Sequence, residues 1–139
     1  MTEIEAIIPL LVYEDVGAAQ DFLVKTFGFT AGCVMQDGEG KTVHAEVRAG
    51  ELAIYLHQVA AEEMLVAPRT RDAVTAALVI HVADVDAHCQ HARSHGARIA
   101  YGPLDQPYGK REYATRDPEG HMWYFQTPLA KPARADRGY

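Results

Sequence analysis

Hydrophobic and polar residues follow two periodic patterns along the chain, one typical of strands and one of helices. The apolar run at residues 7–13 is short and rich in β-favouring residues, as a buried strand would be. Asp15 then stands where a helix N-cap belongs, and apolar side chains follow it at helical spacing as far as Gly28. The pattern therefore predicts a strand followed by a helix at about residues 16–27.

The same pattern returns in the second half of the chain. Residues 78–82 read as a strand and Asp84 as a second N-cap, and Gly96 closes a helix predicted at about 85–95. The two N-cap aspartates stand about 70 positions apart. An offset of this size indicates one supersecondary unit of about 70 residues that occurs twice. The chain therefore contains an internal repeat.

Each repeat reads as a strand, a helix and then three strands joined by tight turns. The segment Asp117-Pro118-Glu119-Gly120 has the composition of a type I turn, and Ala49-Gly50 is a candidate two-residue hairpin turn. We therefore predict an α+β fold in which two tandem βαβββ modules form a curved mixed sheet with a concave cleft. We expect a single domain over residues 1–139, divided into module one at about 5–58, a connector at about 59–75, module two at about 76–127 and a flexible tail at 128–139.

Strand periodicity assigns side chains to two faces of each module. In module one, the apolar residues of 43–47 and 52–56 should pack under the helix. The opposite face then carries polar and aromatic side chains, namely His44, Glu46, Arg48, Tyr55 and His57. In module two we expect His81, Tyr124 and Gln126 to face away from the helix, with Arg111, Tyr113 and Thr115 beside them.

A concave face of this kind is typical of a binding trough for a small organic ligand. Tyr55 and Tyr124 stand at corresponding repeat positions and would supply apolar walls with hydroxyl tips. The residues that we predict to bind the ligand are His44, Glu46, Tyr55, His57, His81, Arg111, Tyr113 and Tyr124. For any one of them the alternative is that this face of an antiparallel sheet is simply in contact with water.

Charge and composition narrow the range of partners. The net charge of −6 argues against nucleic acid, whose phosphates need a basic face, and would attract cationic small molecules unless it serves solubility alone. No apolar stretch approaches the roughly 20 residues of a membrane helix, so we expect no membrane partner. Two cysteines are too few for a disulfide framework and no secretory signal is visible, so we expect a cytoplasmic protein.

Residues 106–121, QPYGKREYATRDPEGH, resemble a motif of the vicinal oxygen chelate superfamily. That superfamily includes glyoxalase I, extradiol dioxygenases, fosfomycin-resistance enzymes and bleomycin-resistance proteins. The resemblance spans about residues 5–127 and is closest to the bleomycin-resistance branch. It implies the paired βαβββ fold and a homodimer. Within the motif, Arg111 and Glu112 could either contact a ligand or form a structural salt bridge.

The resemblance also implies where a metal would bind, with one ligand from the first and last strand of each module. In this chain those positions hold Ile8, Tyr55, Ala77 and Tyr124. Isoleucine and alanine cannot coordinate a cation, and neutral tyrosine is a poor ligand for a hard divalent ion, so we predict no metal and no cofactor. The alternative is a displaced metal site, for which the candidate ligands are His44, Glu46, His57 and His81.

Three further histidines, His88, His91 and His95, recur at helical spacing in the second helix. They could bind a metal at its surface, but we expect them on a solvated helix face.

Two functions of different class follow from these residues. The favoured one is a metal-free protein that binds a small aromatic or cationic organic compound, for example to sequester an antibiotic. The alternative is a superfamily enzyme of lyase, isomerase or dioxygenase type. It would use either the displaced metal site or metal-free acid and base chemistry by the same side chains.

Overall fold

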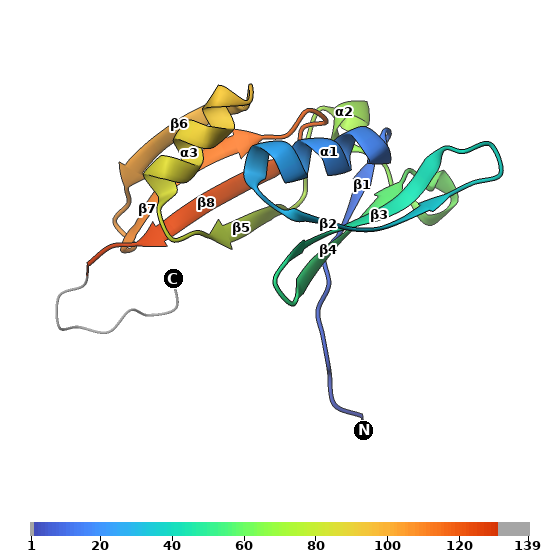
Figure 1. The fold of residues 1–139 in the computed structure, drawn as a ribbon, viewed down its shortest axis with the longest axis horizontal. Helices are drawn as coiled ribbons and strands as arrows, with labels where there is room; N and C mark the ends of the chain where they lie inside the picture. The colour runs from blue at the N-terminus through green and yellow to red at the C-terminus, as the bar shows by residue number, and fades with distance from the viewer. Residues whose placement is uncertain (1, 131–139) are drawn as a thin grey trace. The chain divides into compact units, whose positions relative to one another are not determined.

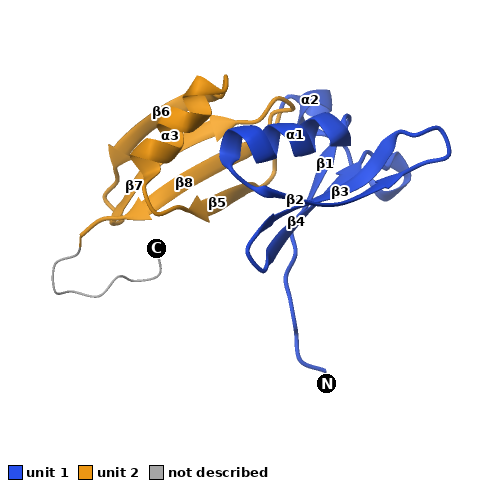
Figure 2. Cartoon of the chain, in the orientation of Figure 1, with its two compact units in different colours: residues 1–72 blue, residues 73–139 orange. Residues whose placement is uncertain are grey.

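The computed structural model describes residues 2–130, so most of the predicted tail, 131–139, lies outside the described residues. The chain divides into two compact units, residues 1–72 and 73–139 (Figure 2). The first contains β1 (Leu10–Tyr13), α1 (Val16–Phe27), β2 (Thr30–Gln36), β3 (Thr42–Ala49), β4 (Leu52–Gln58), η1 (Ala61–Glu63) and α2 (Pro68–Arg71). The second contains β5 (Ala77–His81), α3 (Val85–Ser94), β6 (Arg98–Asp105), β7 (Lys110–Arg116) and β8 (Met122–Pro128).

Both units have the same sheet topology (Figure 1). The first sheet has the strand order β1-β4-β3-β2 and the second the order β5-β8-β7-β6. In each sheet the first strand pairs in parallel with the last, and the other neighbours are antiparallel. The predicted α+β fold of two βαβββ modules is therefore confirmed.

The two long helices begin and end where the sequence predicts. The backbone N–H of Ala18 donates to the Asp15 carboxylate at 3.0 Å, and that of Ala87 donates to the Asp84 carboxylate at 3.1 Å. These side chains satisfy amide groups that lack a partner within the helix. Gly28 ends α1 with a φ of 88°, a left-handed conformation that glycine adopts without steric cost. None of the described helices is long and apolar enough to cross a bilayer.

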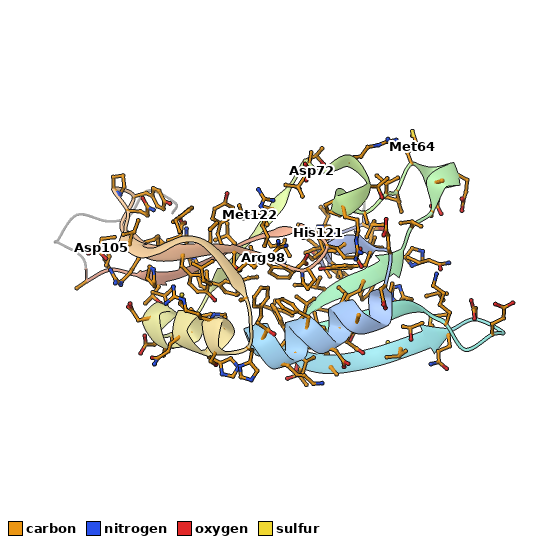
Figure 3. All side chains as sticks on the ribbon, turned by 90° about the horizontal axis from the view of Figure 1, so that it is seen from above. Met64, Asp72, Arg98, Asp105, His121 and Met122 are labelled. Carbon is orange, nitrogen blue, oxygen red and sulfur yellow. The ribbon has the colours of Figure 1, made fainter. Side chains whose placement is uncertain are left out.

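Short helical turns join the two modules. The predicted turn near residue 61 is η1, and α2 follows it. Met64 and Asp72, labelled in Figure 3, end these turns in the left-handed region with φ values of 61° and 53°.

The core of the first unit lies between α1 and the middle of its sheet. Ala45 and Val47 of β3 pair with Leu56 and Ile54 of β4, and all four are buried beneath the helix as predicted. The hairpin turn was predicted one residue too early, because Ala49 pairs with Leu52 and the loop is residues 50–51. This shift moves the cross-strand pairing by two residues, so every side chain keeps its predicted face.

The core of the second unit is aromatic. Trp123 and Phe125 are fully buried, and their rings lie nearly parallel with centroids 6.3 Å apart. The indole N–H of Trp123 donates to the carboxylate of buried Asp117 at 3.1 Å. The predicted turn at 117–120 is confirmed, because the Gly120 N–H donates to the Asp117 carbonyl at 3.0 Å.

The predicted faces of β7, however, are wrong. The Asp117 N–H donates to the His121 carbonyl, so the connection between β7 and β8 is one residue longer than a four-residue turn. A slip of one residue exchanges the two faces of a strand. As a result Tyr113 pairs with Phe125, and Arg111, Tyr113 and Thr115 lie on the helix side of the sheet. Glu112 takes the place on the open face that was predicted for its neighbours.

Candidate functional site

Three predicted ligand-binding residues lie together on the open face of the first sheet. His44 of β3 is directly opposite His57 of β4, and their Nδ1 atoms are 3.3 Å apart. The His44 ring also meets Tyr55 edge-on, with centroids 5.2 Å apart. All three side chains are partly buried. The face thus presents two imidazoles and a phenol side by side, as the sequence predicts.

Glu46 lies on the same face but is held by an ion pair. Its carboxylate accepts a hydrogen bond from Arg48 at 2.8 Å, and this bond raises the pKa of the arginine. Gly32 of β2 leaves room for it, because a Cβ there would stand 2.8 Å from the Glu46 carboxylate. The side-chain amide of Gln20 donates to the Glu46 carbonyl at 2.9 Å and ties α1 to β3. The carboxylate therefore forms an ion pair with the strand's own arginine.

The metal-ligand positions implied by the resemblance are filled with apolar and phenolic groups. Tyr55 pairs with Leu10 of β1, and Tyr124 pairs with Val79 of β5. Ile8 and Ala77 precede these partners by two residues and offer no donor atom. These residues do not fit a divalent ion. For the displaced site, no three His, Cys, Asp or Glu side chains within residues 2–130 form a group that could hold one.

The open face of the second sheet carries a hydrogen-bond network centred on Glu112, which is only 2% exposed. Its Oε1 accepts a bond of 2.6 Å from the Gln126 side-chain amide. Its Oε2 accepts bonds from the hydroxyls of Tyr108, at 2.8 Å, and Tyr101. His81 joins the network through the Gln126 side-chain oxygen, with 3.1 Å between Nε2 and Oε1. Every strand of the second sheet contributes one residue, and Tyr108 comes from the turn before β7.

Burial of the two phenols raises the pKa of Tyr101 and raises that of Tyr108 to about 12. The bonds that they donate to Glu112 add to this effect, because deprotonation would lose a bond and place two anions in contact. Both hydroxyls therefore remain hydrogen-bond donors at neutral pH.

Two predicted ligand residues, Arg111 and Tyr113, instead hold α3 against the sheet. Arg111 pairs through two nitrogens with Asp86 of α3, at 2.8 and 3.0 Å, and through the third with Asp105 at 2.9 Å. The Tyr113 hydroxyl is 2.7 Å from Nδ1 of His88, and its ring stacks on Phe125. The expectation that Arg111 and Tyr113 face the trough is wrong because of the longer turn.

His88 also departs from the expected solvated helix face. It is half-buried, and its ring lies against Phe125 with centroids 4.2 Å apart and the planes tilted by 32°. His91 and His95 are exposed as expected.

The sequence analysis named Glu112 only as a possible ligand contact or salt-bridge partner, missed Tyr101 and Tyr108, and did not single out Gln126 as a site residue. A signal for Glu112 was present, since it stands between Arg111 and Tyr113 and must face away from both. Tyr101 carried no such signal. Its position depends on Gly102, where a Cβ would lie 2.4 Å from the Glu112 carbonyl and where φ is 87°. Only glycine allows β6 to approach β7 this closely.

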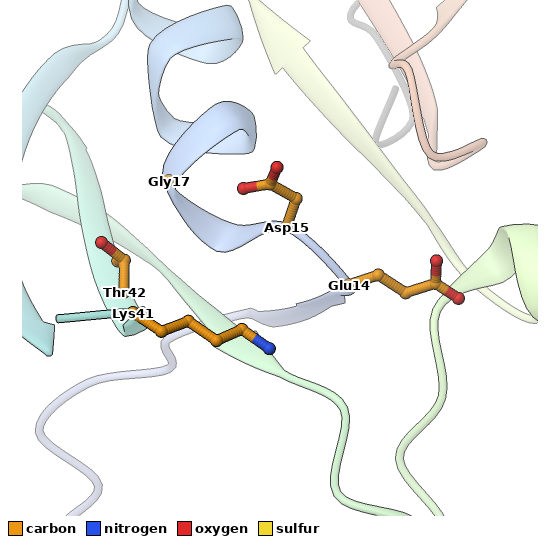
Figure 4. A pocket seen from close by; sticks show the side chains of 5 residues that line it. All are labelled: Glu14, Asp15, Gly17, Lys41 and Thr42. Atoms are coloured by element: carbon orange, nitrogen blue, oxygen red, sulfur yellow. The ribbon is translucent and has the colours of Figure 1, made fainter. Parts of the chain in front are cut away.

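A separate polar pocket of about 350 Å³ lies where α1 begins (Figure 4). It is lined by Glu14, Asp15, Gly17, Lys41 and Thr42. Asp15 caps the helix, and Glu14 binds Thr70 at 2.9 Å and Arg69 at 3.4 Å. These acidic groups have structural roles, and no predicted ligand residue lines the pocket.

Comparison with known proteins identifies the family. Residues 6–125 match the model of the Glyoxalase/Bleomycin resistance protein/Dioxygenase superfamily. The chain belongs to this superfamily. A curated relative, the uncharacterized protein Mb0911c of Mycobacterium bovis, is 30% identical over 128 residues, which cover 89% of this chain and 84% of that protein.

Solved structures with the same fold include TioX from Micromonospora sp. ML1, which is 28% identical with a TM-score of 0.72 and covers 90% of this chain and 99% of its own. TnmS3, an antibiotic binding protein from Streptomyces sp. CB03234, is 22% identical with a TM-score of 0.69. The match covers 92% of this chain and 98% of TnmS3. The bleomycin-binding protein of Streptomyces verticillus, solved with copper(II)-bleomycin, is 24% identical with a TM-score of 0.63. The match covers 94% of this chain and 100% of that protein. At 22% and 24% identity, the matches to TnmS3 and to the bleomycin-binding protein show a shared fold and nothing more.

Proposed function

We propose that this chain binds a small aromatic or cationic organic compound without a metal of its own and acts by sequestering it. The observation that carries the proposal is the replacement of the metal-ligand positions by aromatic and apolar groups. Tyr55 faces Leu10 in the first sheet, and Tyr124 faces Val79 in the second. Rings and aliphatic side chains with a few fixed polar groups are the usual lining of a small-molecule site.

Two further observations support the proposed binding of a cationic organic compound. TnmS3 is an antibiotic binding protein and the Streptomyces verticillus protein binds bleomycin, and both share the fold. The net charge of −6 favours cationic compounds over anionic ones. Antibiotics that are both planar and cationic are therefore the first class of ligand to test.

The test is a screen of planar compounds, cationic and neutral, against the purified protein. Trp123 precedes Tyr124 in β8 and is buried on the opposite face of the strand, so its fluorescence should change when a ligand occupies the open face. Metal content measured on the same preparation, purified without chelators, separates the two functional classes. Micromolar binding by protein with less than stoichiometric metal is the expected result, and one tightly held ion per chain would refute the metal-free proposal.

Assembly and location form part of the same proposal. We expect a homodimer in the cytoplasm, with no nucleic-acid or membrane partner, on the basis of the family resemblance and the acidic charge. Light scattering should give twice the chain mass of 15.3 kDa. A 15.3 kDa particle at micromolar concentration would contradict the dimer.

The His44–His57 pair favours an enzyme as the second candidate. Two imidazoles with 3.3 Å between Nδ1 atoms can exchange a proton, which suits metal-free acid and base chemistry of a lyase or isomerase. A bound compound that is converted by the protein, and is no longer converted by His57→Gln, would favour this alternative.

A further inference from the structure

Glu112 is a buried carboxylate whose described hydrogen bonds all come from neutral groups. Removing a carboxylate from water is costly unless hydrogen bonds or an opposite charge compensate. Here the donors are the hydroxyls of Tyr101 and Tyr108 and the amide of Gln126. Lys110 lies two residues earlier on the same strand and is equally buried, with interactions of its own. The negative charge of Glu112 is thus solvated by dipoles within the network.

Aromatic residues stand at both ends of the row next to this carboxylate, two positions further along β7. Tyr101 of β6 is opposite Ala114 of β7, which in turn is opposite Tyr124 of β8. Strands lie about 4.8 Å apart, so the backbones that carry the two tyrosines are roughly 10 Å apart. A group held between the rings would be within about 6 Å of both ring centroids, which is the range of a cation–π contact.

The third ring comes from Tyr108, whose hydroxyl binds the same Oε2 atom as that of Tyr101. Tyr124 is close enough to both phenols to interact with them electrostatically. Tyr101 is 36% exposed, and Tyr108 and Tyr124 are partly exposed, so part of each residue can be reached from solvent. Three tyrosines therefore lie close to one buried carboxylate on the open face.

We propose that Tyr101, Tyr108 and Tyr124 form an aromatic cage above Glu112 that binds a substituted ammonium group of the ligand. The inference rests on the proposed binding function and assigns the cationic part of the ligand to the second unit. A cation in this cage gains from the electron-rich ring faces and from the field of the carboxylate below.

The hydrogen bonding of Glu112 also selects the kind of cation. Its oxygens already accept three bonds, so the ligand does not need N–H groups to replace those donors. A primary ammonium would lose hydrogen bonds to water on entering the cage, whereas a fully methylated nitrogen has none to lose. The cage should therefore prefer quaternary ammonium to primary ammonium compounds.

The test compares choline with its neutral isostere, 3,3-dimethylbutan-1-ol, by NMR titration of the full chain. Choline should bind at least tenfold more tightly than the isostere and more tightly than ethanolamine. Tyr124→Leu should weaken choline binding about tenfold or more, whereas Tyr124→Phe keeps the ring and should retain it. Glu112→Gln should weaken the binding of choline but not that of the neutral isostere. If Glu112→Gln fails to fold, Tyr108→Leu serves in its place and should also weaken choline binding.

Leu52→Ala, at the exposed tip of the hairpin in the first unit, is the control and should leave choline binding unchanged. Equal affinity for choline and the neutral isostere, or no choline binding, would overturn the cage. If neutral planar compounds still bind in a way that depends on Tyr55 and Tyr124, the proposed function stands and only the cage fails. If no organic compound binds at all, both fail.

Discussion

Gln126 and Glu112 lie directly opposite each other on β8 and β7, and the Gln126 side-chain amide donates a hydrogen bond of 2.6 Å to the Glu112 carboxylate. Both side chains are buried, so water does not readily replace this bond if it is lost. The pair joins His81 at one edge of the sheet to the tyrosines at the other. It therefore fixes the polar part of the open face.

Replacing Gln126 with leucine should leave Oε1 of Glu112 without its described donor. An unsatisfied buried acceptor costs about 1–3 kcal/mol, and more when it is charged, so we expect a loss of unfolding free energy of at least that size. Urea denaturation measures it. Gln90→Leu, on the exposed side of α3, is the control and should change stability by less than about 0.5 kcal/mol. Equal effects of the two substitutions would contradict the role given to this bond.

Gly102→Ala should disturb the approach of β6 to β7. The residue has a φ of 87°, and a Cβ there would stand 2.4 Å from the Glu112 carbonyl. A left-handed conformation alone costs a non-glycine residue about 1–3 kcal/mol, and the contact with backbone adds to this. Gly38→Ala is a matched control, because a Cβ at that position meets nothing within 4 Å. Thermal unfolding of both variants should show a large loss for Gly102 alone.

Stability should fall at alkaline pH. Burial raises the pKa of Tyr101, Tyr108 and Tyr113 above the ordinary value of 10.0, to about 12 for Tyr108. Above pH 10 the unfolded chain releases these protons while the folded chain retains them, so the unfolding free energy decreases as pH rises. Their contribution is complete below pH 10 and is lost as pH rises through the folded pKa values.

Denaturant unfolding measured at several pH values above 10 checks this expectation. Tyr108→Phe removes one of the three groups, so the fall in stability with pH should be shallower in that variant. A stability that is independent of pH in this range would show that the phenols are not shielded from solvent.

Arg111→Gln should leave ligand binding unchanged. The guanidinium pairs with Asp86 and Asp105 on the helix side of the sheet, and both carboxylates are well exposed. Such surface pairs contribute roughly 0–1 kcal/mol, so a small loss of stability is the expected effect. A marked loss of affinity for a ligand of the open face, with the fold intact by circular dichroism, would restore Arg111 to the binding site.

Much of the fold could be predicted from the sequence because its signals are local. Asp15 and Asp84 cap their helices through bonds to amides three residues ahead, so a short stretch of sequence is enough to place them. In the first unit, the error in the hairpin turn displaced the pairing by two residues, and His44, Tyr55 and His57 kept their face.

The second site could not be predicted because it depends on loop length and on close approach of strands. One added residue in the connection that ends at His121 moved Arg111 and Tyr113 to the helix side and Glu112 to the open face. Tyr101 reaches Glu112 only because Gly102 lets two backbones come close together. Neither effect is visible in the alternation of polar and apolar residues.

The most direct test of the account is the affinity of a planar cationic compound for the protein and for Tyr124→Ala, measured by calorimetric titration. A stacking contact adds about 0.5–1.5 kcal/mol to the area that a ring buries, so the variant should bind about tenfold more weakly or worse with its fold intact. Leu52→Ala, at the exposed tip of the first hairpin, should bind as the parent does. If no such compound binds below millimolar concentration, or if Tyr124→Ala binds it unchanged, the binding function proposed here is wrong.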